Sequence, residues 1–190
     1  MEKVIFHRFD SRAILPTKST TDSAAYDLYA IINPPVNASM GPIYTRYNGS
    51  LDSPLNAIYD PSDGTLNILS QKHIFINTGL NVCIPDGYML EIRPRSGLSN
   101  KNLIIIPNSP GTIDSDYCGV GSNFELKVGF FNLNTKNVPI KHGDRIAQIL
   151  LRKLDEYEFV ESNYEDFYKM VLDKSSNRTG GFGSTGSWEK

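Results

Sequence analysis

Short segments rich in β-branched and aromatic residues recur along the chain and are separated by turn residues at close intervals. In one of them, Tyr88, Leu90 and Ile92 occupy alternate positions. The positions between them include Glu91 and Arg93, so one face of a strand can be buried while the other carries charge. The strand candidates of this kind are residues 4–9, 27–32, 73–80, 88–94, 103–107, 125–132 and 145–154. Their spacing predicts an all-β barrel or sandwich.

Two stretches depart from this pattern. Residues 33–64 contain five prolines together with Asn-Gly and Asp-Gly pairs, which favours a long surface insertion over a core element. In residues 164–174 apolar side chains recur at helical spacing, which predicts one short amphipathic helix. These apolar residues are Tyr164, Phe167, Tyr168, Val171 and Leu172.

The C-terminal residues 175–187 consist mostly of Gly, Ser and Thr, a composition typical of a flexible coil. Phe182 lies in this stretch between two glycines. Either the tail closes over a ligand with this aromatic, or the tail is a linker in which the Phe is incidental. We therefore expect a β domain over residues 1–174 and a flexible arm over residues 175–190.

Composition is that of an ordinary globular protein. The chain has 190 residues, of which 39% are hydrophobic and 21% charged, about the size of one domain. Its formal net charge of -2 lacks the basic excess on which binding to polymeric DNA or RNA depends, so we expect no polymeric nucleic acid as partner. No apolar run is long enough to cross a bilayer, and the first residues do not form a signal peptide. These features predict a cytoplasmic or nuclear protein with no membrane partner.

The two cysteines, Cys83 and Cys118, are far apart in the sequence and belong to no CxxC or Cys/His cluster. Neither a disulfide framework nor a zinc site is therefore indicated, and a reducing compartment fits best. The three histidines are isolated from one another, which gives little support to a His-based triad or metal site.

Four polar clusters interrupt the strand-like sequence. They are Asp27 within AAYDLYA, residues 93–99 (RPRSGLS), residues 108–117 (NSPGTIDSDY) and residues 143–148 (GDRIAQ). The arginines and hydroxyls of RPRSGLS suit a polyphosphate, although a solvated turn has the same composition. Asp114 and Asp116 lie two positions apart, so on an extended backbone both face the same side and one can act as a base. A polar hairpin turn is the alternative interpretation of that cluster.

Taken in order, these clusters and the tail resemble the five motifs of the homotrimeric deoxyuridine triphosphatases (dUTPases). The matching strings are AAYDLYA, RPRSGLS, NSPGTIDSDYCG, GDRIAQIL and RTGGFGSTG. The resemblance implies a distorted, jelly-roll-like β-barrel that assembles as a homotrimer. It also implies hydrolysis of dUTP to dUMP and pyrophosphate, which limits uracil in DNA and supplies dUMP for dTMP synthesis.

The resemblance assigns the chemistry to particular positions. Asp114 matches the general base that activates water for attack on the α-phosphorus. The residues matched to phosphate binding are Arg95, Ser96, Gly97 and Gln148. Mg²⁺ is expected to chelate the triphosphate, and Asp27 is expected to contact the ion only through water.

The resemblance also implies how the nucleoside is held. Tyr117 matches the tyrosine that packs on the deoxyribose and leaves no space for a 2′-hydroxyl. The uracil edge is expected to be read by Asn108 and by the backbone of Gly111, Thr112 and Ile113. Phe182 matches an aromatic that stacks on uracil when the arm of a neighbouring subunit closes. The other arm residues expected at the substrate are Arg178, Gly183, Ser184 and Thr185.

The sequence departs from the family pattern in four places. More residues than usual follow Tyr117, so residues 120–124 are expected to bulge. Arg178 lies four residues before Phe182, one fewer than is usual, and both the insertion at 33–64 and the helix before the arm are atypical. Two other functions stay open: a dCTP deaminase, which needs a glutamate where this chain has Asp114, and an interaction protein that has lost turnover.

Overall fold

β-strands account for most of the regular structure in the computed structural model, which describes residues 2–33, 43–46 and 55–174. Four antiparallel strands form the sheet that carries most of the polar clusters, in the order β10 (Gly111–Ile113), β8 (Tyr88–Pro94), β13 (Arg145–Lys153) and β2 (Tyr26–Tyr29). In the centre of this sheet, Gln148 is the register partner of both Arg93 and Asp27. Directly opposed residues point to the same face of a sheet, so these three side chains form one row.

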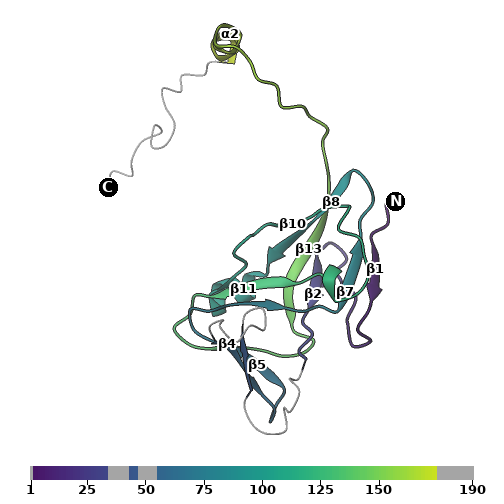
Figure 1. Ribbon diagram of the computed structural model, residues 1–190, viewed down its shortest axis with the longest axis vertical. Coiled ribbons are helices and arrows are strands. Elements are labelled where there is room, and N and C mark those ends of the chain that lie inside the picture. The colour runs from purple at the N-terminus through teal and green to yellow at the C-terminus, as the bar shows by residue number, and fades with distance from the viewer. Residues whose placement is uncertain (1, 34–42, 47–54, 175–190) are drawn as a thin grey trace. The chain divides into compact units, whose positions relative to one another are not determined.

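Three further sheets complete the strand pairing in the described residues. β1 (Ile5–Arg8) pairs with β7 (Leu80–Cys83), and β11 (Val128–Asn132) pairs with both β6 (His73–Ile76) and β9 (Ile104–Ile105). The last sheet has the order β12 (Val138–Ile140), β5 (Thr65–Ile68), β4 (Leu55–Asp60) and β3 (Ile43–Arg46). Figure 1 shows the β4–β5 pair at one end of the β unit and β1 along its side. These four sheets confirm the predicted β class. Within the described residues no ladder of paired strands closes on itself, so a closed barrel is not observed.

The core lies between these sheets and is made of aliphatic and aromatic side chains from many strands. The largest fully buried side chains include Phe130, Leu28, Ile68, Ile76 and Leu80. A buried polar residue, Asn132, has no exposed surface, and its amide nitrogen donates to the carbonyl oxygens of Ile68, Leu69 and Lys136 at 2.9–3.1 Å. Because a buried amide without partners is costly, these three bonds fix the ends of β5 and β11 against each other.

Two predictions about strands are wrong. The stretch 33–64 is not wholly a surface insertion, because it contains β3 and β4, and Ala57 and Tyr59 are buried in the core. The turn-forming prolines of this stretch hid β4 from the sequence pattern, and β4 pairs both with β3 inside the stretch and with β5 outside it. The single strand predicted over 73–80 is divided into β6 and β7 because the chain turns at Gly79, whose φ is +67°.

The structure has two α-helices in its described residues where the sequence predicts one. α1 (Ser96–Asn102) directly follows β8, and α2 (Tyr164–Lys174) is the predicted helix. α1 escapes prediction because it has only 7 residues and no buried ones, so it carries no apolar periodicity. A 3-10 helix, η3 (Ser122–Phe124), lies in the loop after Tyr117, within the stretch 120–124 for which the bulge stays a prediction.

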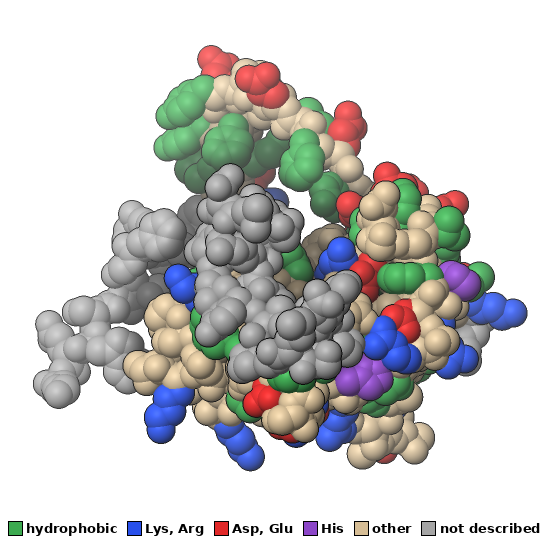
Figure 2. Space-filling model, turned by 60° about the horizontal axis from the view of Figure 1, so that its bottom comes forward, with side chains coloured by type: hydrophobic (Ala, Val, Ile, Leu, Met, Phe, Trp, Pro, Cys, Tyr) green, Lys and Arg blue, Asp and Glu red, His purple; other side chains and the backbone are tan. Residues whose placement is uncertain are grey.

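The chain divides by contacts into a unit covering Met1–Leu154 and a unit covering Asp155–Lys190. In the second unit, Asn163 caps α2: its Oδ1 accepts from the backbone N–H of Asp166 at 3.0 Å, and its Nδ2 donates to the carboxylate of Asp166 at 2.8 Å. No residue of α2 is buried, and its apolar side chains are visible in Figure 2. The predicted boundary between a domain at 1–174 and an arm at 175–190 stays a prediction, because residues 175–190 lie outside the described part of the chain. Neither helix of the described ranges is long and apolar enough to span a membrane.

Candidate functional site

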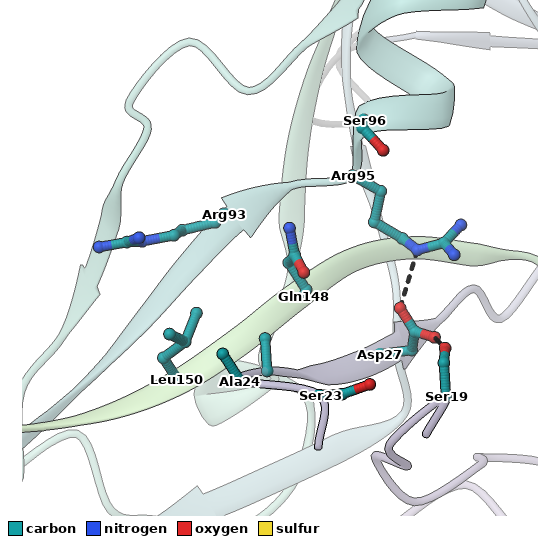
Figure 3. Close-up of a pocket in the computed structure, with 10 residues that line it drawn as sticks. Ser19, Ser23, Ala24, Asp27, Arg93, Arg95, Ser96, Gln148 and Leu150 are labelled. Atoms are coloured by element: carbon teal, nitrogen blue, oxygen red, sulfur yellow. Dashed lines mark hydrogen bonds and ion pairs between the residues drawn. The ribbon is translucent and has the colours of Figure 1, made fainter. Parts of the chain in front are cut away.

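A cavity of about 390 Å³ opens beside β2, β8, β13 and the start of α1, and we call it the phosphate pocket. Figure 3 shows its polar side chains, with Arg95 and Ser96 at the junction of β8 and α1 and Gln148 rising from β13. The residues that line the pocket are Ser19, Ser23, Ala24, Ala25, Asp27, Arg93, Arg95, Ser96, Gln148 and Leu150. The alternation of the strands aims these side chains to one face, so three sequence clusters meet here.

A buried carboxylate organises the cations of the phosphate pocket. Asp27 is 7% exposed, and its Oδ1 accepts from Arg95 Nε at 2.8 Å. Its Oδ2 accepts from Ser19 Oγ at 2.8 Å and from Arg145 Nη1 at 3.4 Å. One carboxylate thus faces two guanidinium groups, which leaves one positive charge in excess beside the cavity. Such an excess, carried by guanidinium groups held at fixed angles, suits an anionic ligand.

Three other features of this pocket leave room for a ligand. Gln148 Nε2 donates to the carbonyl of Pro94 at 2.8 Å, which fixes the amide and leaves its oxygen free of protein partners in the described residues. Ser96 is exposed, and a Cβ added at Gly97 would meet nothing within 4 Å. Arg93 is different, because its guanidinium is paired with Glu91 and extends away from Arg95 in Figure 3.

A second cavity of about 440 Å³ lies beside the turn that follows β10, and we call it the hairpin pocket. It is lined by Phe75, Thr112, Ile113, Asp114, Tyr117, Glu125, Leu126 and Lys127. The backbone N–H of Tyr117 donates to the carbonyl of Asp114 at 3.1 Å, which closes the turn between these two residues. Asp114 is exposed, and within the described residues its carboxylate makes no hydrogen bond or ion pair, so it is open to water.

The strand β10 brings the remaining hairpin residues together. Gly111 pairs with Ile92 of β8, and a Cβ at Gly111 would lie 3.4 Å from the side-chain nitrogen of Asn108. The amide of Asn108 therefore packs directly on the glycine backbone. A Cβ at position 111 would thus lie in van der Waals contact with that amide.

Comparison with known proteins shows the family of this chain. A family model described as dUTPase matches residues 49–186. The chain is 41% identical over 153 residues to the deoxyuridine 5′-triphosphate nucleotidohydrolase of Finegoldia magna, covering 80% of this chain and 96% of that protein. It is 36% identical over 186 residues to the enzyme of the same name from Leptospira interrogans, covering 97% and 99% of the two chains. This chain belongs to the dUTPase family.

The structural comparison supports the fold of the dUTPase family. A mutant dUTPase from phage phi11 of S. aureus, solved with a structural Mg(II) ion, matches with a TM-score of 0.58 and 18% identity. The match covers 86% of this chain and 99% of the phage chain. At this identity the likeness concerns the fold.

The dUTPase motifs of this chain fall into two separate groups. The phosphate pocket brings together Asp27, Arg95, Ser96 and Gln148, and the hairpin pocket brings together Asp114 and Tyr117. The two pockets share no lining residue. The motif residues Arg178, Phe182, Gly183, Ser184 and Thr185 lie outside the described residues.

Two residues of the phosphate pocket, Ser19 and Ser23, were not singled out from the sequence. Arg93 and Arg145, which belong to the predicted polar clusters, line this pocket and bond to Asp27, respectively. The run of Ser and Thr before the first motif was the available signal for the serines, but its role depends on the isolated bridge between Thr17 and Asp27, which only folding creates.

The two cysteines are paired with each other, contrary to the prediction from the sequence. Cys83 at the end of β7 and Cys118 directly after Tyr117 form a disulfide, with their Cα atoms 4.9 Å apart. The prediction of no disulfide is wrong because two residues 35 positions apart in the sequence become neighbours in the folded chain. The argument for a reducing compartment therefore loses the support of unpaired cysteines.

Proposed function

We propose that this chain hydrolyses dUTP to dUMP and pyrophosphate, and so limits uracil in DNA and supplies dUMP for dTMP synthesis. The observation that carries the proposal is the match of residues 49–186 to the dUTPase family model, because this range includes Asp114 together with Arg95, Ser96 and Gln148 of the phosphate pocket. The two relatives that are 36–41% identical are both named deoxyuridine 5′-triphosphate nucleotidohydrolase, and the match covers nearly the whole length of each.

The phosphate pocket is the proposed site of the triphosphate. Arg95 keeps its Nη2 free of partners among the described residues, while Nε and Nη1 bond to Asp27 and to the carbonyl of Arg145. The guanidinium is thus oriented before substrate arrives, and it can present a charge-assisted donor to a phosphate oxygen. Ser96, the backbone N–H of Gly97 and the second N–H of the Gln148 amide nitrogen, whose first N–H donates to Pro94, complete the proposed donors to phosphate.

The hairpin pocket is the proposed site of the base, the sugar and the attacking water. The Asp114 carboxylate accepts a proton from water as the water oxygen bonds to the α-phosphorus, and the bond from this phosphorus to the bridging oxygen breaks to release pyrophosphate. Asn108 and the backbone of Gly111, Thr112 and Ile113 read the uracil edge. Tyr117 packs on the deoxyribose.

The residues of the phosphate pocket fit a Mg²⁺ ion held mainly by the substrate. Mg²⁺ is usually bound by one or two carboxylates together with substrate phosphates and water. Asp27 is the one carboxylate in the lining, its two oxygens already accept from cations and a hydroxyl, and the described residues contain no group of three or more His, Cys, Asp or Glu side chains that could hold a metal. A contact through water is therefore the proposed role of Asp27. When bound, the ion neutralises phosphate charge.

We also propose that the working enzyme is a homotrimer of jelly-roll-like subunits in the cytoplasm or nucleus. The separation of the two pockets supports this, because Asp114 must meet the α-phosphorus of a triphosphate bound near Arg95. A neighbouring subunit supplies the missing half. The arm residues Arg178, Phe182, Gly183, Ser184 and Thr185 are proposed to close over the substrate from another subunit.

A first experiment measures pyrophosphate release from dUTP, dTTP, dCTP and UTP, with native mass determined on the same sample. We expect release from dUTP alone at an appreciable rate and the mass of a trimer. Rapid turnover of all four nucleotides would contradict the proposed specificity. Ammonia release from dCTP would instead identify a deaminase.

A second experiment tests the shared site by mixing two impaired variants, Asp114→Asn and Arg95→Ala, after joint refolding, with activity measured at dUTP concentrations well below KM, where both variants are slow. If each site takes its general base, Asp114, from one subunit and Arg95 from another, about a quarter of the sites in a random equal mixture carry both residues intact. We expect activity to return to that level. A mixture as inactive as the separate variants would place both groups in the same chain.

A further inference from the structure

Residues 120–124, which follow the turn of Tyr117, form a loop whose tip is exposed but whose ends are fastened. Val120 is 80% exposed, and Gly121 turns the chain with φ of +81° into η3. Phe124 ends this helical turn and is 39% exposed. Since nothing in the proposed chemistry uses this loop, its attachment to the hairpin pocket needs another explanation.

Asn81 of β7 fastens the backbone of the loop. This residue is 2% exposed, its Oδ1 accepts from the N–H of Gly121 at 2.9 Å, and its Nδ2 donates to the carbonyl oxygens of Gly121 and Phe124, both at 2.9 Å. A buried amide with three partners holds the loop in one conformation. The disulfide from Cys83 of the same strand to Cys118 fixes the loop at its beginning.

Glu125 fastens the end of the loop. Its buried carboxylate accepts from the backbone N–H groups of Thr78 at 3.1 Å and of Gly79 at 2.8 Å, between β6 and β7. The carbonyl of Glu125 in turn accepts from the hydroxyl of Tyr117 at 3.2 Å. The Tyr117 hydroxyl also lies 3.4 Å from the carbonyl of Asn123, so the loop determines where the Tyr117 ring lies.

Phe124 supplies the packing partner of that ring. The centroids of the Tyr117 and Phe124 rings are 5.8 Å apart, with their planes tilted by 57°. The backbone of Gly119 also lies against the Phe124 ring, because a Cβ added at Gly119 would come within 2.4–2.6 Å of the ring carbons. Phe124 thus packs on both Gly119 and Tyr117, and it restricts the movement of the tyrosine.

We propose that Phe124 is a positioning residue that holds Tyr117 in place and thereby strengthens the preference for a deoxyribose over a ribose triphosphate. The inference rests on the proposed function, in which Tyr117 packs on the sugar. Excluding one hydroxyl group requires a ring that does not move aside, and the loop supplies that rigidity through Phe124.

The test compares kcat/KM for dUTP and for UTP in the wild-type enzyme and in Phe124→Ala. We expect the ratio of the two values to fall by roughly 2- to 10-fold, the range that one aromatic pair supports. The kcat/KM for UTP should rise and the KM for dUTP should rise, while kcat for dUTP changes less because Phe124 takes no part in the proposed proton transfer to Asp114. A merely structural role would lower both kcat/KM values together and leave their ratio unchanged.

Four further variants keep the test decisive. Phe124→Tyr retains the ring and should restore the ratio, whereas Val120→Ala, in the same loop but 80% exposed, should leave it unchanged. Gly119→Ala displaces the Phe124 ring and should lower the ratio, with no further loss when combined with Phe124→Ala. Asn81→Ala releases the loop without touching either ring. Thermal unfolding identifies any variant that does not fold.

The outcomes separate this inference from the proposed function. A wild-type enzyme that hydrolyses UTP as well as dUTP would remove the proposed role of Tyr117 and this inference with it. The role of Phe124 alone would be overturned by a different result. In that result the wild type prefers dUTP and Tyr117→Ala loses the preference, but Phe124→Ala and Asn81→Ala fold and prefer dUTP as strongly as the wild type.

Discussion

The phosphate pocket and the hairpin pocket are held together by different forces. In the phosphate pocket, charged side chains on neighbouring strands hold one another, with Asp27 bonded to both Arg95 and Arg145. In the hairpin pocket, Asp114 has no ion pair or hydrogen bond among the described residues, and order comes from packing and backbone bonds around Tyr117.

This difference agrees with the different tasks proposed for the two pockets. A triphosphate carries charge in any nucleotide, so its site needs oriented cations and little discrimination. Telling one sugar from another requires shape that does not yield, and a base that must accept a proton from water needs an open carboxylate. Changes in the two pockets should therefore affect different kinetic parameters.

The largest effect is expected in the hairpin pocket. Asp114→Asn removes the proton acceptor and should lower kcat by about 10² to 10⁴, the usual share of a general base, with little change in KM. Asp116→Asn is the matched control, because it removes an exposed carboxylate from the same turn and should retain activity within a few-fold. Pyrophosphate release measures both. Comparable losses in the two variants would contradict the assignment of the base.

A smaller effect is expected in the phosphate pocket. Arg95→Ala removes a charge-assisted bond to phosphate and should lower kcat/KM by roughly 10- to 100-fold, mainly through KM. Arg95→Lys keeps the charge but loses the guanidinium fork, so it should recover only part of the loss. Arg152→Lys, on β13 but outside the pocket lining, serves as the control. Full activity of Arg95→Ala would remove it from substrate binding.

The disulfide should contribute to stability more than to catalysis. Removing a cross-link between positions 35 apart should lower the free energy of unfolding by about 2 to 4 kcal/mol, since the unfolded chain regains conformational freedom. Urea unfolding of Cys118→Ser, compared with the wild type with and without a dithiol reductant, measures this loss. Equal stability of the three samples, or two free thiols in the unreduced wild type, would contradict the bond.

The smallest effect concerns pH and lies outside both pockets. Burial lowers the pKa of His73 in β6 from its ordinary value of 6.5, because the charged imidazolium loses hydration there. The unfolded state then binds the proton more readily, so stability present above pH 6.5 is lost as the pH falls through the lower folded pKa. His73→Gln should flatten this dependence. Thermal unfolding midpoints between pH 7 and pH 5 provide the measurement, and an unchanged slope in His73→Gln would exclude the residue as its source.

Much of the fold followed from local pattern. The alternation in residues 88–94 predicted β8 with its boundaries, and the spacing from Tyr164 predicted α2. α1 and β4 were missed because a helix of 7 residues has too few turns to show periodicity, and because prolines around β4 outweighed its apolar positions. The motifs located both pockets through Asp27, Arg95 and Asp114, and the resemblance gave them their roles.

The sequence by itself determined which side chains share a face and which family the motifs match, because strand alternation and motif order are properties of neighbouring residues. Only the tertiary structure decided that Cys83 meets Cys118, that Asn81 holds the loop at 120–124, and that the phosphate pocket and the hairpin pocket are separate. The disulfide and the bonds of Asn81 join residues far apart along the chain, and each pocket gathers residues from several segments. Their pairing depends on how whole strands pack, and no local pattern encodes that.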